Sequence, residues 1–327
     1  MTLKVLKCHG SGNDFILIDE MAGNYSFTEE ERKNIAAALC DREKAVGADG
    51  ILFVLASRCC DGRMRIFNAD GSEPEMCGNG LRCVGRYVLE KLNRNVVTIE
   101  TMKAQYEVKK AEELYEGVNT IEIIIESLTF GVSDLPLNYP EDRLFFGKLE
   151  ELSPVLDFSA VSVTNPHLVA VVEEINEEQL VSVGTKANST TSLLPKGVNV
   201  NFVKVIDEQN LYVKTYERGV GLTKACGTGM TASTVVACMA GKCPLGREIN
   251  IFNDGGMIRC IVNRKEDGKY YVQFIGNATY VFKAEIDMKD IKESLDASID
   301  YKPFEAETRQ YENMFGYTRE VIENLTK

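Results

Sequence analysis

Two copies of a Cys-Gly-x-Gly box, at residues 77–80 and 226–229, lie 149 residues apart in this 327-residue chain. Each box follows a short apolar run typical of a strand and opens a run with helical periodicity. Asn13 and Asn165, each followed by a strand-like run, repeat the pattern at an offset of 152 residues. Short apolar runs recur by chance in any α/β protein. Chance does not explain why these runs recur at nearly the same offset as the two cysteine boxes. We therefore predict a duplicated domain.

The rest of the chain predicts many strands and few helices. The strands expected in the first half are 3–7, 15–18, 51–56, 64–68, 96–101, 106–109 and 121–126. Helices are predicted at 28–40, where Thr28 and Glu31 have the spacing of a capping box, and at 80–92. A third helix, 230–240, is apolar on nearly every side and should be buried. We expect a mixed α+β fold with two pseudo-symmetric halves, each a mostly antiparallel sheet or barrel wrapped around a central helix.

The expected boundaries follow from the repeat. The N-terminal half should span 1–128, with 276–286 returning to it, and the C-terminal half 129–275. Residues 287–327 then form an extra tail. The tail residues that fall on one helical face are Tyr311, Phe315, Thr318, Ile322 and Leu325, which predicts a docked amphipathic helix. The helix could pad the N-terminal half, cover the surface of a homodimer or bind another partner.

Composition excludes several partners. The net charge of −12 argues against nucleic acid and anionic membranes, because a phosphate-binding surface needs clustered Lys and Arg. The sequence shows no signal peptide and no run of 18 apolar residues, so we expect a cytoplasmic protein without a membrane span. The ten cysteines are scattered, which predicts free thiols, and no C-x-x-C pair is present. Zinc sites usually combine cysteines with histidines, and the chain has only two histidines, His9 and His167, so no metal site is expected.

The chemistry of the boxes follows from their place at helix starts. A glycine-rich turn into a helix leaves backbone N–H groups that can bind a carboxylate. The helix N-terminus should also lower the pKa of a thiol placed on it, so Cys77 and Cys226 are candidate bases facing one site. Arg218 offers a planar fork for a carboxylate, although a lone Arg is often only a partner in a surface ion pair.

Four separated motifs together resemble diaminopimelate epimerases. The motifs are 13–15 (Asn-Asp-Phe), 68–72 leading into the first box, 165–167 (Asn-Pro-His) and 217–219 leading into the second box. The resemblance implies an isomerase that uses neither pyridoxal phosphate nor another cofactor. It would interconvert LL- and meso-diaminopimelate on the route to lysine and peptidoglycan. The substrate would bind in a cleft between the two halves.

The resemblance also implies roles for individual residues. Cys77 and Cys226 would act as acid and base on opposite faces of a nearly planar carbanion, one as thiol and one as thiolate. The residues that would bind substrate are Asn13, Asn68, Gly78, Asn79, Asn165, Asn199, Glu217, Arg218, Gly227 and Thr228. Of these, the N–H groups of the two boxes would hold the reacting carboxylate. His167 would assist near one cysteine or serve as a neutral wall residue. Gly50 stands where some members of the family carry a Gln that contacts the substrate.

Two other functions stay open. An amino-acid racemase of the same fold could act on another substrate, such as histidine. A thiol hydrolase could instead use Cys226 with His167 as its dyad, but that reading gives Cys77 and its matched box no role.

Overall fold

The computed structural model describes residues 2–43, 45–74, 76–287 and 301–325, which form two compact units. Unit 1 takes the described residues within Met1–Ile123 and Ile275–Met314, and unit 2 those within Ile124–Phe274 and Phe315–Lys327. Both units combine strands with helices, so the predicted α+β class is confirmed.

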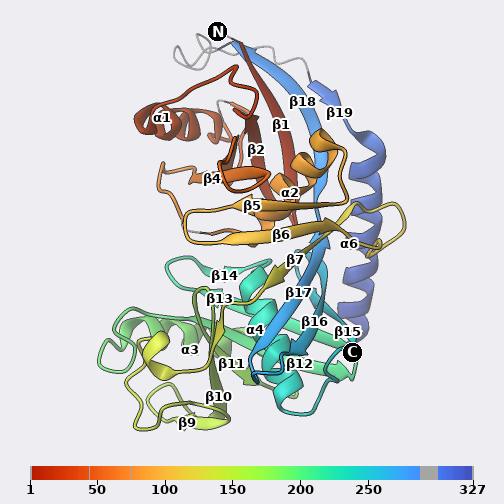
Figure 1. The fold of residues 1–327 in the computed structure, drawn as a ribbon. Coiled ribbons are helices and arrows are strands. Elements are labelled where there is room, and N and C mark those ends of the chain that lie inside the picture. The colour runs from red at the N-terminus through yellow and green to blue at the C-terminus, as the bar shows by residue number, and fades with distance from the viewer. Residues whose placement is uncertain (1, 44, 75, 288–300, 326–327) are drawn as a thin grey trace. The chain divides into compact units, whose positions relative to one another are not determined.

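Unit 1 is a mixed sheet in which each parallel pair of neighbouring strands is joined through a helix (Figure 1). Its elements are β1 Thr2–Gly10, β2 Asn13–Asp19, α1 Glu29–Leu39, β3 Gly50–Leu55, β4 Gly62–Asn68, α2 Gly78–Leu92, β5 Val96–Glu100, β6 Gln105–Lys110, β7 Thr120–Ile125, β18 Thr279–Asp287 and β19 Tyr301–Pro303. Strands β2 and β3 are parallel across α1, and β4 and β5 are parallel across α2, whereas β3–β4 and β5–β6 are antiparallel. Parallel neighbours need such long crossovers, so the helices fall where the pairing requires them.

Unit 2 repeats this order. Its elements are β8 Leu128–Thr129, the 3₁₀ turn η1 Val132–Asp134, β9 Gly147–Leu149, β10 Ser153–Val163, β11 Pro166–Val171, α3 Glu177–Ser189, β12 Asn199–Asp207, β13 Asn210–Glu217, β14 Gly221–Thr223, α4 Gly227–Met239, β15 Glu248–Asn253, β16 Gly256–Arg264 and β17 Tyr270–Asn277. Strands β11 and β12 are parallel across α3, β12–β13 is antiparallel, β13 and β15 are parallel across α4, and β15–β16 is antiparallel. The same sequence of pairings in both units confirms the predicted pseudo-symmetry.

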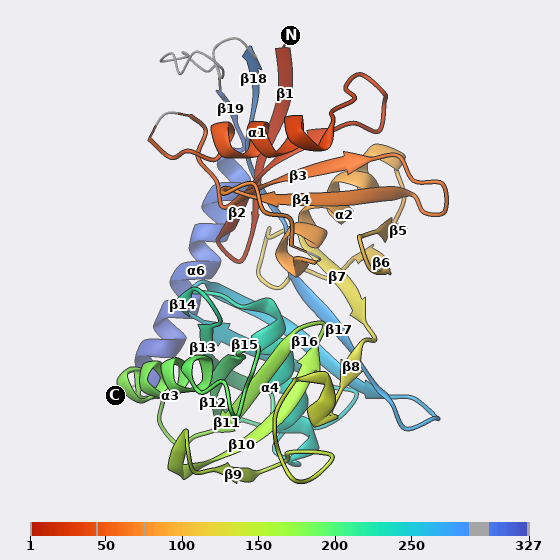
Figure 2. The same cartoon turned by 90° about the vertical axis from the view of Figure 1, so that its left-hand side faces the viewer.

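Each unit surrounds one central helix. Helix α2 contacts the strands β1 to β6, and α4 contacts β10 to β13, β15 and β16 (Figures 1 and 2). Residues 229–238 of α4 are all buried, as the apolar sequence predicts. Gly85 lets α2 approach β6, because a Cβ there would clash with the side chain of Val108.

Helix boundaries differ from the sequence predictions by a few residues. Helix α1 has Thr28 as its N-cap with the predicted capping box. Helices α2 and α4 begin two and three residues earlier than predicted, and so the cysteine of each box becomes the N-cap. Helix α3 was not predicted, although Asn176 caps it and Leu180, Val183 and Ala187 bury one face. Burying a side chain such as Leu180 contributes about 1.5–3 kcal/mol, so this face outweighs a modest helical propensity.

The tail contains a long helix, α6 Glu305–Leu325, while residues 288–300 and 326–327 of the tail lie outside the described part. Within unit 1, the Glu307 carboxylate forms two hydrogen bonds with the buried Arg86 guanidinium, at 2.6 and 2.9 Å. Tyr311 packs its ring edge to face with His9, and Met314 is fully buried. Within unit 2, Thr318 is fully buried.

Candidate functional site

The first box places Cys77 at the N-terminus of α2. Cys77 has an extended backbone, and its Sγ accepts a hydrogen bond from the Gly80 N–H at 3.5 Å. The thiol also donates to Asn13 Oδ1 at 3.8 Å, and Asn79 Nδ2 donates to the same oxygen at 3.2 Å. The structure therefore brings together the predicted site residues Asn13, Cys77 and Asn79.

Asn68 and Gly50 lie opposite each other in the antiparallel β3–β4 pair. Asn68 Nδ2 donates to Ser72 Oγ at 2.9 Å in the loop that leads to the first box. A Cβ on Gly50 would lie 2.6 Å from the Phe67 carbonyl oxygen. The backbone here leaves no room for a longer side chain, which gives a local reason for the glycine where some family members carry Gln.

The second box places Cys226 at the N-terminus of α4. Cys226 is 7% exposed, and its Sγ lies 3.6 Å from Thr228 Oγ1. Glu217 ends β13 and accepts a hydrogen bond from Thr223 Oγ1 at 2.8 Å, and its carboxyl group interacts with the Cys226 thiol. Cys226, Glu217 and Thr228 thus form the counterpart of the Cys77 cluster.

The last glycine of each box is required by close packing. A Cβ on Gly80 would lie 2.8 Å from Leu52 Cδ2. A Cβ on Gly229 would clash with Asn201 Oδ1 and lie 2.8 Å from Thr215 Oγ1. In both units, therefore, the first turn of the central helix rests on the strands beneath it.

Both thiols have raised pKa values, which corrects the sequence expectation. Burial raises the pKa of Cys77 to about 11, although the N–H groups of Gly80 and Asn79 lower it. Burial also raises the pKa of Cys226 well above its usual range, and the nearby Glu217 charge adds to the rise. The helix N-terminus acts in the predicted direction, but the loss of hydration is the larger effect because it penalises the thiolate.

His167 is neutral and fully engaged. It is completely buried on β11, and burial lowers its pKa to about 3. Asn201 Nδ2 donates to Nδ1 at 3.1 Å, which leaves Nε2–H to donate to Asn165 Oδ1 at 2.9 Å. The ring thus orients Asn165, a predicted substrate residue. Sequence reasoning did not identify Asn201, whose one signal is a polar residue within the apolar run 200–203.

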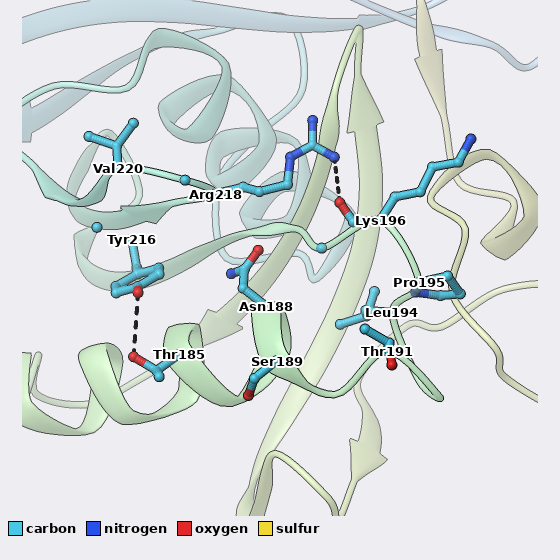
Figure 3. A pocket seen from close by; sticks show the side chains of 13 residues that line it. Thr185, Asn188, Ser189, Thr191, Leu194, Pro195, Lys196, Tyr216, Arg218 and Val220 are labelled. Carbon is cyan, nitrogen blue, oxygen red and sulfur yellow. Dashed lines mark hydrogen bonds between the residues drawn. The ribbon is translucent and has the colours of Figure 1, made fainter.

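Asn199 and Arg218 meet at the end of the β12–β13 pair. Asn199 is 5% exposed, and its Oδ1 accepts a hydrogen bond from the Arg218 backbone N–H at 2.9 Å. The Arg218 guanidinium donates to the Lys196 carbonyl oxygen at 2.8 Å. Figure 3 shows this bond at the rim of a hollow of about 630 Å³ between the end of α3 and the turn 218–221. Of the predicted site residues, only Arg218 lines that hollow.

Within residues 2–43, 45–74, 76–287 and 301–325, no three side chains of the kinds that ligate metals are clustered. In the same part of the chain, no helix has both the length and the apolar character needed to span a membrane.

Solved structures of other proteins share the fold. A phenazine biosynthesis protein of the PhzF family from Bacillus anthracis matches with a TM-score of 0.64 at 18% identity, covering 88% of this chain and 100% of that one. A hydroxyproline epimerase from Agrobacterium vitis matches with a TM-score of 0.57 at 14% identity, covering 87% and 91%. At these identities the likeness establishes the fold alone.

Sequence comparison identifies the family. The family model for diaminopimelate epimerase matches residues 5–120 and 159–281. The diaminopimelate epimerase of Clostridium acetobutylicum is 56% identical over 319 residues, covering 97% of this chain and 95% of that protein. That of Ligilactobacillus salivarius is 43% identical over 296 residues, covering 88% and 91%. The chain belongs to the diaminopimelate epimerase family, and the Clostridium match extends into the tail.

Proposed function

We propose that this isomerase interconverts LL- and meso-diaminopimelate without pyridoxal phosphate, in the synthesis of lysine and peptidoglycan precursors. The proposal depends on one observation that both units repeat. Each unit places a buried or half-buried cysteine at the N-cap of its central helix. Membership of the family and 56% identity to the Clostridium enzyme support the choice of substrate.

The two thiols would divide the proton transfers. Inversion at a carbon needs a base on one face and an acid on the other, and Cys77 and Cys226 supply one group from each unit. The α-hydrogen of an amino acid is a far weaker acid than a thiol, and whichever cysteine acts as the base would first have to lose its proton against its raised pKa. A thiolate of high pKa is the stronger base, and its thiol partner keeps its proton at neutral pH.

The helix N-termini would hold the reacting carboxylate. Neither α2 nor α4 has an acidic residue in its first turn, so no side chain of either turn offsets the partial positive charge of the helix end, although Glu217 of β13 lies near Cys226. The N–H groups of Gly78, Asn79, Gly227 and Thr228 would stabilise the negative charge that develops as the proton leaves. This arrangement takes the place of a cofactor that withdraws electrons.

The remaining polar residues would hold the distal end of the substrate. By the proposal, amide, carboxylate and guanidinium groups for this amino acid would come from Asn68, Asn165, Asn199, Glu217 and Arg218. Arg218 uses one of its five N–H donors on Lys196. His167 would assist by orienting Asn165 and not by transferring a proton, since both ring nitrogens are engaged.

Isotope exchange in D₂O tests the substrate. Deuterium should enter the α-carbon of LL-diaminopimelate and should not enter histidine. Exchange into histidine alone would overturn the choice of substrate and favour the racemase.

Substitution of the cysteines tests the mechanism. Cys77→Ala and Cys226→Ala should each lower epimerisation by at least about a thousandfold, since each removes an acid–base group. Cys59→Ala, at an exposed cysteine, is the matched control and should keep full activity. Full activity of Cys77→Ala would refute the two-thiol mechanism.

The hydrolase alternative has little to support it, because the His167 ring bonds to Asn165 and Asn201 and so is not available to Cys226 as a base. A cytoplasmic location and a homodimer stay predictions. Light scattering of the purified protein checks the second.

A further inference from the structure

The amide of Asn13 has one orientation that its neighbours permit. Its Nδ2 lies 2.6 Å from Asp49 Oδ2, and a carboxylate can only accept. The atom that faces Asp49 must therefore be the nitrogen, which turns Oδ1 toward Asn79 Nδ2 and Cys77 Sγ. The hydrogen bond to Asp49 thus determines that the oxygen of the Asn13 amide, and not its nitrogen, contacts the Cys77 sulfur.

Asp49 is itself held firmly. Its Oδ2 accepts a second hydrogen bond from the Asp14 backbone N–H at 3.1 Å, and its Oδ1 pairs with the Arg42 guanidinium at 2.8 Å. Its own backbone N–H donates to the Asp14 carbonyl oxygen at 3.0 Å, and its carbonyl oxygen accepts from the Ala69 N–H at 3.2 Å. The backbone of Asp49 and its carboxylate are thus both held by hydrogen bonds, and a carboxylate held in this way can impose an orientation on its neighbour.

The orientation of Asn13 acts on the protonation of Cys77. A carbonyl oxygen facing the sulfur accepts a bond from the thiol and repels the thiolate, whereas an N–H would favour the thiolate. Among the titratable groups that act on Cys77, Cys83 on α2 raises the pKa of the thiol and Arg82 on α2 lowers it. The sulfur also interacts with Asn13 and with the backbone N–H groups of Asn79 and Gly80.

We propose that Asp49 is a positioning residue, which holds the Asn13 amide so that its carbonyl oxygen faces Cys77 and favours the thiol of Cys77 over the thiolate. The proposal deepens the proposed function and rests on it for the catalytic role of Cys77. Asp49 touches neither the sulfur nor the reacting carbon and acts through Asn13.

The test is the pH dependence of Cys77 alkylation by iodoacetamide, without substrate, read from the mass of the peptide that carries Cys77. In Asp49→Asn the Asn13 amide can turn, so alkylation at pH 8 should be roughly tenfold faster than in the wild type, which corresponds to a fall of about one pKa unit. Epimerisation should lose roughly ten- to a hundredfold in kcat, with KM changed less than threefold. Asp49→Ala removes the carboxylate without supplying another hydrogen-bonding group and should shift alkylation the same way, which covers the case in which Asp49→Asn does not fold.

Arg42→Gln is the matched control, because it removes the ion pairs that Arg42 forms with Asp49 and with Asp14 and leaves the bond from Asn13 to Asp49. It should alkylate at the wild-type rate, and a shift equal to that of Asp49→Asn would overturn the proposal. A double-mutant cycle with Asn13→Ala completes the test. In the Asn13→Ala protein, Asp49→Asn should cause no further change in the alkylation rate of Cys77, and an additive change would also overturn the proposal. Should the wild type lack epimerase activity, the proposed function fails, yet the alkylation profile still decides whether Asp49 acts on Cys77.

Discussion

At the scale of single residues, the two histidines show how burial decides chemistry. His9 and His167 are both buried and neutral, with pKa values lowered by burial to about 4 and about 3. His9 lies in unit 1 against Tyr311, and His167 lies in unit 2 between Asn165 and Asn201. Neither environment accommodates the charged imidazolium without loss of stability.

This predicts that the protein loses stability on mild acidification. Between the unfolded pKa of 6.5 and the folded values, the unfolded chain binds more protons, so the free energy of unfolding falls as pH falls. By pH 5 each histidine should cost about 2 kcal/mol relative to pH 7. Urea unfolding at both pH values checks this, and His9→Gln should remove roughly half of the difference. Equal unfolding free energies at pH 5 and pH 7 in the wild type would show the prediction to be wrong.

At the scale of elements, the central helices carry the site because their first turns pack closely on strands. Gly229 is the clearest case, since its Cα faces Asn201 and Thr215 with no room for a methyl group. The sequence predicted both central helices, because their periodicity is local. It also placed both cysteines at helix starts, but it put the first helical residue two or three positions too late and so missed that the cysteines are the N-caps.

We predict that Gly229→Ala displaces the first turn of α4 and lowers kcat by roughly a hundredfold, because small misplacements of reacting groups are costly. Gly316→Ala is the matched control. It lies inside α6 with no atom within 4 Å of a new Cβ, so it should raise stability by up to about 1 kcal/mol and leave activity unchanged. Steady-state kinetics with thermal melts distinguish the two. A fully active Gly229→Ala would mean that the turn tolerates the shift.

At the scale of the whole molecule, the duplication and the fold class could be predicted because a repeat at a constant offset can be recognised from the sequence alone, without knowing which residues are in contact. The sign of the thiol pKa shifts could not be read in the same way, since burial of Cys77 and Cys226 depends on distant strands. Asp49 escaped notice for a similar reason. Its contact with Asn13 arises from the parallel pairing of β2 with β3, in which Phe15 lies opposite Gly50. No pattern near residue 49 points to it.

The tail helix α6 is attached to unit 1 by an ion pair between Glu307 and the buried Arg86. The side chain of Arg86 is 7% exposed and that of Glu307 20% exposed, and Arg86 also donates to the Ala278 carbonyl oxygen and stacks on the Tyr280 ring. Glu307→Gln removes the bidentate carboxylate while Glu90, at 2.7 Å, still pairs with the guanidinium, so the change should cost about 1.5–3 kcal/mol. Glu285→Gln is the control, since Glu285 pairs with Lys4 on the surface and should change stability by less than about 1 kcal/mol. Differential scanning calorimetry compares the two variants. Limited proteolysis should cut α6 faster in Glu307→Gln, and a helix as resistant as in the wild type would show that its attachment does not depend on the ion pair.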